Sequence, residues 1–103
     1  MAKFLYGYHG GKMPETEAEE QASIAAWVAW VTKYEASMPD PGNPVGQSKT
    51  VSASGISDDG GANPLSGYAI IEAANIDEAT SIANECPIIG EGGSVEVAQI
   101  MEM

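Results

Sequence analysis

One histidine and three tyrosines are the main candidates for chemistry in this chain. His9 is the only histidine, and it follows a predicted strand and precedes two glycines, where functional side chains often lie. Imidazole titrates near neutral pH, so His9 could be a general acid or base, or a loop residue without a task. Tyr6, Tyr8 and Tyr68 fall in predicted strands and could line a face that binds an apolar or aromatic ligand. Packing in the core or at a dimer interface is the alternative for these rings.

Trp30 and Lys49 are further candidates for ligand binding. Trp30 flanks the apolar stripe of a predicted helix, so it could border a pocket or cover the rim of a sheet. Trp27 lies on the stripe itself, and we predict a structural role for it. Lys49 lies in a polar predicted strand, where it could hold an anionic substrate or be an ordinary surface charge.

Other side chains that often carry chemistry favour simpler interpretations. Cys86 falls on an apolar helical stripe and is expected to be an inert buried thiol. Glu72 and Glu96 lie in largely apolar strands, and we expect edge positions that face solvent. Asp58 and Asp59 share a glycine turn without the further oxygen ligands that Ca²⁺ requires, so no metal site is predicted. The glycines at 90–93 precede a strand rather than a helix, so the dinucleotide fingerprint is not met and no cofactor is predicted.

The elements that must position these residues alternate along the chain. Thr16 with Glu19, and Asn75 with Glu78, have the spacing of helix N-caps, and apolar residues then recur at helical intervals. Runs of β-branched and aromatic residues predict strands. The expected elements are a strand at 3–8, a helix ending before Pro39, strands at 45–56 and 66–73, a helix closed by Pro87, and a strand at 94–101. This β-α-β-β-α-β order predicts an α+β, ferredoxin-like fold with a four-stranded antiparallel sheet and two helices on one face.

Bulk composition limits the function. The 103 residues predict a single domain, 1–103, and the formal net charge of −11 disfavours nucleic acid and anionic lipid as partners. No apolar run of membrane-spanning length and no signal peptide are recognisable, so we expect a cytoplasmic protein. Because the strands place apolar residues on both sheet faces, we also expect a homodimer that covers the face without helices.

Several motifs together resemble the YCII-related domains, including their DGPF-like branch. The motifs are the strand 3–6, Pro14-Glu15, the segments 66–71 and 75–79, Cys86-Pro87 and the segment 92–97. The resemblance implies a ferredoxin-like fold that dimerises into an α/β barrel, with a pocket beside each sheet. It also implies that some members are small enzymes that act on ring compounds through a His–Asp pair.

That pair has no match in this chain. The family places its histidine in the first helix, and residues 17–38 contain none; His9 and two glycines stand where the aspartate is expected. The Asp-Gly-Pro-Phe sequence is replaced at 59–64. Our first hypothesis is therefore a domain that binds or senses a small organic ligand without catalysis. The alternatives are a small lyase or isomerase that uses His9, and a structural or protein-interaction dimer.

Overall fold

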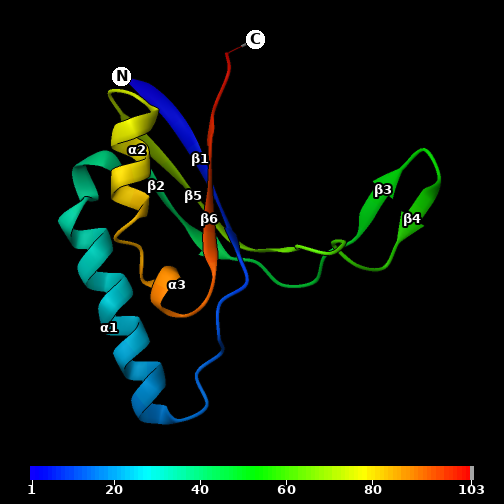
Figure 1. The fold of residues 1–103 in the computed structure, drawn as a ribbon, viewed down its shortest axis with the longest axis horizontal. Helices are drawn as coiled ribbons and strands as arrows, with labels where there is room; N and C mark the ends of the chain where they lie inside the picture. The colour runs from blue at the N-terminus through cyan, green and yellow to red at the C-terminus, as the bar shows by residue number, and fades with distance from the viewer. Residues whose placement is uncertain (103) are drawn as a thin grey trace.

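The structure is a computed structural model that describes residues 1–102, and it contains a four-stranded antiparallel sheet with helices on one face (Figure 1). The elements are β1 Ala2–His9, α1 Glu17–Lys33, a 3₁₀ turn Glu35–Ser37, β2 Asp40–Pro44, β3 Thr50–Ser52, β4 Gly55–Ser57, β5 Leu65–Ala73, α2 Ile76–Ala83, α3 Pro87–Gly90 and β6 Ser94–Gln99. The sheet order is β2-β5-β1-β6, and β3 and β4 form a separate two-stranded sheet. The predicted α+β, ferredoxin-like fold class is confirmed.

The two predicted helix starts are present. The Thr16 side chain accepts a hydrogen bond from the Glu19 backbone N–H at 3.1 Å, which caps α1. The Asn75 side chain does the same for the Glu78 N–H at 2.9 Å and caps α2. Both helices end earlier than predicted. A short further helix, α3, begins at Pro87, because proline is well suited to the first position of a helix.

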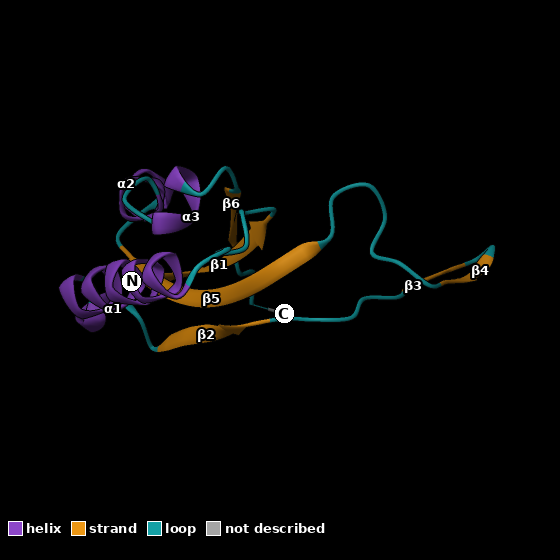
Figure 2. Cartoon of the chain, turned by 90° about the horizontal axis from the view of Figure 1, so that it is seen from below, coloured by secondary structure: helices purple, strands orange, loops and turns teal. Residues whose placement is uncertain are grey.

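The core lies between the sheet and the helices. Along β1, the side chains of Phe4, Tyr6 and Tyr8 point toward the helices and are buried. Pleating places the intervening side chains on the opposite face, where Leu5 is exposed. We call this opposite side the open face, because within residues 1–102 no helix covers it (Figure 2). In the same described part of the chain, no helix is long and apolar enough to span a membrane.

The predicted second strand, 45–56, is wrong. The strand that joins the sheet is β2, Asp40–Pro44, in a proline-rich segment for which no strand was predicted. Its prolines are tolerated because β2 is an edge strand, where one side of the backbone needs no partner. Gly42 has a φ of +77°, and an added Cβ would lie 1.6 Å from a carbonyl oxygen of β5, so only glycine allows this close approach.

Residues 45–64 instead leave the sheet and form a projecting segment, which we call the arm (Figures 1 and 2). The arm carries the hairpin of β3 and β4, in which Val51 is paired with Ile56.

Candidate functional site

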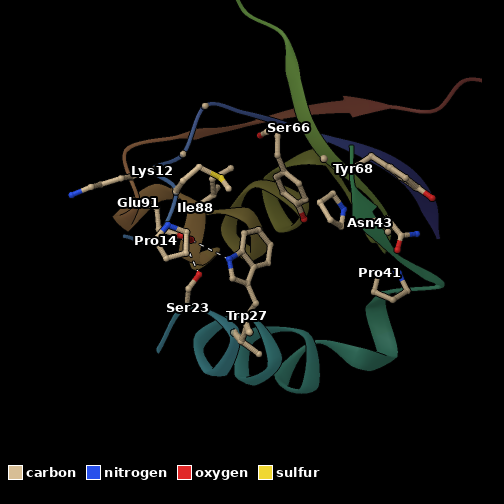
Figure 3. A pocket seen from close by; sticks show the side chains of 18 of the residues that line it. Lys12, Pro14, Ser23, Trp27, Pro41, Asn43, Ser66, Tyr68, Ile88 and Glu91 are labelled. Atoms are coloured by element: carbon tan, nitrogen blue, oxygen red, sulfur yellow. Dashed lines mark hydrogen bonds between the residues drawn. The ribbon is translucent and has the colours of Figure 1, made fainter. Parts of the chain in front are cut away.

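A pocket of about 520 Å³ lies on the helix side of the sheet, next to the end of β1 (Figure 3). Its walls come from the end of β1 and the loop after it, the middle of α1, β2, the start of β5, and α3 with the residue that follows it. Such a volume is within the range of pockets that hold small organic ligands.

The pocket exists because part of the apolar stripe of α1 does not reach the core. Trp30 is the one buried residue of this helix, and Trp27 and Val31 pack against the core beside it. Ile24 and Val28 are 56% and 58% exposed although both are large and apolar. These two side chains line the pocket instead of a closed core. The apolar side chains of α1 are therefore divided between the core and the pocket, and Trp27 contacts both.

Four aromatic rings form the back of the pocket and continue into the core. The rings of Tyr8 and Trp27 meet edge to face, with centroids 5.4 Å apart and an interplanar angle of 78°. Trp27 is packed in the same way against Trp30 at 5.8 Å, and Trp30 stacks on Tyr6 at 6.4 Å. The Trp30 indole N–H donates to the Ile82 carbonyl at 3.0 Å, which ties the cluster to α2. The pocket wall is thus held from behind by packed core residues.

Glu91 fixes the exposed end of this cluster. One carboxylate oxygen accepts a hydrogen bond from the Trp27 indole N–H at 3.0 Å, and the other accepts from the Ser23 hydroxyl at 3.1 Å (Figure 3). Both bonds link the end of α3 to α1 across the pocket. Sequence reasoning missed Glu91, Ser23 and the pocket position of Trp27. A glutamate in a glycine-rich turn gives no pattern that separates it from a solvated charge.

Two residues that line the pocket carry buried hydroxyl groups that lack a nitrogen or oxygen hydrogen-bond partner in the described chain. They are Tyr8 and Ser66. The Tyr8 hydroxyl lies beside the Cys86 thiol, which is only a weak hydrogen-bonding group. Burial, followed by the nearby Cys86 thiol, raises the pKa of Tyr8 well above its ordinary value, so this hydroxyl stays protonated and can donate. Buried polar groups nearly always have partners, so both oxygens indicate a site that a ligand could complete.

The position of Ser66 follows from an irregularity in the sheet. Tyr8 is paired with Gly67 and His9 with Leu65, so Ser66 is an extra residue in β5 at this point. Such bulges redirect a side chain and often occur beside functional sites. Gly67 makes room for the Tyr8 ring, because an added Cβ would lie 3.0 Å from a carbon of that ring.

His9 lies on the open face and does not line this pocket. It is the last residue of β1 and is 8% exposed. One ring nitrogen, Nδ1, is 3.0 Å from the Asn63 carbonyl oxygen and 3.2 Å from that of Pro64. The other, Nε2, is 3.1 Å from a carboxylate oxygen of Glu96. Both ring nitrogens therefore lie within hydrogen-bonding distance of oxygen acceptors.

The other predicted binding residues lie in three different places. Tyr8 and Tyr68 both border the pocket, but Tyr68 is paired with Gly7 and so its side chain belongs to the open face; Figure 3 shows it turned away from Trp27. Tyr6 and Trp30 are in the core behind the pocket. Lys49 is on the arm, where its ammonium group is 3.1 Å from Asp58.

Two further observations concern reactive groups and metals. Cys86 is buried, and burial raises the pKa of its thiol to about 11, which leaves little thiolate at neutral pH. Within residues 1–102, no group of three or more His, Cys, Asp or Glu side chains is arranged to hold a metal ion.

Comparison with known proteins gives a family and a fold. The model of the YCII-related domain matches residues 5–103. A solved structure of 5-chloro-2-hydroxyhydroquinone dehydrochlorinase from Burkholderia phenoliruptrix, in complex with 2,5-dihydroxybenzoquinone, is similar with a TM-score of 0.58. The two sequences are 18% identical, and the match covers 98% of this chain and 95% of the other. No curated protein matches the sequence.

Proposed function

Because this chain belongs to the family of YCII-related domains, we propose that it is a homodimeric protein that binds a small organic molecule in the pocket between α1 and the sheet. The observation that carries the proposal is the largely apolar pocket itself, of about 520 Å³, whose lining includes Tyr8 and Ser66, two residues with buried hydroxyls that lack a nitrogen or oxygen partner. Leaving a buried hydroxyl without a partner costs about 1–3 kcal/mol. A ligand oxygen bonded to these groups would recover much of that cost.

The proposed ligand is a flat ring compound with hydroxyl or carbonyl oxygens. Apolar side chains, including Ile24, Val28 and Ile88, supply most of the walls, and Trp27 offers an aromatic edge. A small number of polar side chains, among them Ser66, Asn43 and Lys12, interrupt these apolar walls and would orient a ring by its oxygens. The similar dehydrochlorinase structure holds 2,5-dihydroxybenzoquinone, a molecule of this kind, and that supports the choice of ligand class.

Binding or sensing is favoured over an enzyme that uses His9. A general acid or base must reach the proton it moves, and His9 is absent from the pocket lining. Its ring is already occupied by Asn63, Pro64 and Glu96. A purely structural dimer is disfavoured because it does not account for the open pocket or for the two buried hydroxyls beside it.

The dimer proposal depends on the open face. Leu5, Leu65 and Ile100 are 41%, 49% and 38% exposed, although each is a large apolar residue. A second copy placed face to face would remove them from water, as expected for a barrel made of two sheets. The acidic composition and the single, buried Cys86 support a cytosolic location.

Isothermal titration of the purified protein with 2,5-dihydroxybenzoquinone tests the binding proposal. Ser66→Ala removes one pocket hydroxyl and should weaken binding roughly 2- to 12-fold, the equivalent of one neutral hydrogen bond. Ser81→Ala is the matched control, because the Ser81 hydroxyl bonds to a carbonyl within α2. No heat of binding at millimolar ligand, or equal losses in both variants, would contradict the proposal.

A second assay separates binding from catalysis. If the probe is converted during the titration, His9→Ala should leave its turnover unchanged under the binding proposal. Loss of turnover with retained affinity would favour the enzyme instead.

A further inference from the structure

The arm, residues 45–64, has no place in the ligand proposal. It leaves the lower end of the sheet and projects on the side opposite the helices, which is the side of the open face (Figure 1). Its two strands, β3 and β4, pair only with each other. A lone two-stranded hairpin is marginally stable in water, so a projecting hairpin of this kind needs another surface.

One side of the hairpin is apolar. Val51 and Ile56 are directly opposite each other in the antiparallel pair, so their side chains share a face. They are 75% and 70% exposed. Ser52 and Ser57 occupy the other face of the same hairpin. An exposed pair of branched apolar side chains at the end of an arm marks a contact surface.

The C-terminal end of the arm contacts the open face of the sheet, and this contact limits the directions in which the arm can project. The His9 ring is close to the carbonyl oxygens of Asn63 and Pro64, the last residues of the arm. The same ring contacts Glu96 of β6. The His9 side chain, which belongs to β1, therefore links the end of the arm to β1 and β6.

The chain exposes more surface than a typical monomer of its mass, and the excess is large enough for a dimer interface. A typical monomer of this mass exposes about 5,500 Å². This chain exposes 6968 Å². The excess of roughly 1,500 Å² exceeds the ~800 Å² that one partner buries in a standard interface. The Cα radius of gyration, 14.8 Å, is likewise larger than the ~13 Å expected for a compact domain of this length.

We propose that the arm of each chain clasps a second copy of the same chain, with Val51 and Ile56 packed against the partner's body. The inference rests on the proposed dimer and adds its specific contact. The arm projects from the very face that a sheet-to-sheet partner would cover, so a partner there must lie alongside the arm. Two-fold symmetry then gives two equivalent clasps. An apolar clasp also suits two copies that each carry a net charge of −11 and repel one another.

The dimer dissociation constant, measured by sedimentation equilibrium of the full chain, tests this clasp. The double variant Val51→Asp with Ile56→Asp should raise this constant at least tenfold. Ser52→Asp with Ser57→Asp adds the same charge to the other hairpin face and should raise it less than threefold. Equal effects of the two double variants would overturn the inference.

Two further measurements distinguish the contribution of the arm to dimerisation from that of the open face. Leu5→Asp on the open face should also dissociate the dimer; if it does while the Val51 and Ile56 variant stays dimeric, the clasp is wrong and the sheet-face dimer stands. A photoreactive benzoylphenylalanine at position 56 should form cross-links between two different chains. In a mixture of unlabelled and isotope-labelled protein, mass spectrometry would detect these as cross-linked peptides that combine one unlabelled and one labelled chain. Cross-links only within one chain, or a monomeric wild-type protein at 100 µM (about 1 mg/mL), would overturn the clasp without touching the ligand titration.

Discussion

Tyr6 and Tyr8 lie two residues apart on the same face of β1, and we expect removal of their hydroxyls to have opposite effects on stability. The Tyr6 hydroxyl donates to the Ala79 carbonyl, so Tyr6→Phe should lower the free energy of unfolding by about 1–2 kcal/mol. The Tyr8 hydroxyl is buried with only the weakly hydrogen-bonding Cys86 thiol beside it. Tyr8→Phe should therefore raise the free energy of unfolding by about 1 kcal/mol, because a buried polar group without a strong hydrogen bond is removed.

Thermal denaturation measures this contrast directly. For a domain of this size, about 1 kcal/mol corresponds to roughly 4–8 °C in Tm. Tyr8→Phe should thus melt several degrees above the wild type, and Tyr6→Phe several degrees below it. The same Tyr8→Phe variant should bind 2,5-dihydroxybenzoquinone roughly 2- to 12-fold more weakly. A Tyr8→Phe variant that is less stable than wild type and binds the ligand equally tightly would refute the argument that this hydroxyl forms a hydrogen bond with a ligand.

Three further predictions follow from the backbone, the thiol and the carboxylate at the pocket. Gly42→Ala should lower stability by at least about 3 kcal/mol because of its clash with β5, whereas Gly46→Ala, which meets nothing within 4 Å, should not; equal melting temperatures would contradict this. Stability should fall as pH rises from 9 to 11, because burial raises the pKa of the Cys86 thiol from 9.0 to about 11 and the unfolded chain loses that proton first. Urea denaturation at several pH values should show a shallower fall for Cys86→Ala, and parallel curves would count against it. Glu91→Ala removes the acceptor of the Trp27 indole N–H, so it should loosen this ring and shift the tryptophan emission to longer wavelengths, whereas an unchanged spectrum would mean that the carboxylate does not hold the ring.

Local signals in the sequence were sufficient for most of the fold. The caps at Thr16 and Asn75 act within one turn of helix, so they can be recognised from neighbouring residues alone. The same holds for the strands of β1, β5 and β6, whose aromatic and branched residues suit a half-buried surface. The order of these elements then led to the ferredoxin-like arrangement that the structure has.

The error at the second strand has a physical cause. The segment 40–44 contains two prolines and a glycine, which locally disfavour a strand. Its place in the sheet depends on pairing with β5, and that pairing is a long-range contact. Residues 45–56, in contrast, have plausible strand residues but pair only within their own hairpin.

The site was predicted only in part, because it depends on register and on where a helix leaves the sheet. Tyr6, Tyr8 and Tyr68 were expected to share a face, but the pairing of Tyr68 with Gly7 places it on the opposite side from the other two. The stripe on α1 indicated which residues face the sheet. It could not show that Ile24 and Val28 stay exposed and line a pocket, or that Trp27, which packs against the core as predicted, also borders that pocket.

A titration followed by two-dimensional ¹H–¹⁵N NMR tests the central claim most directly. The labelled protein would be titrated with 2,5-dihydroxybenzoquinone, and the shifted signals assigned. The account predicts the largest shifts at the Trp27 indole N–H and at the backbone amides of Ser66 and Gly67, around the pocket. Shifts confined to Leu5 and Glu96 on the open face, or no shift at millimolar ligand, would contradict it.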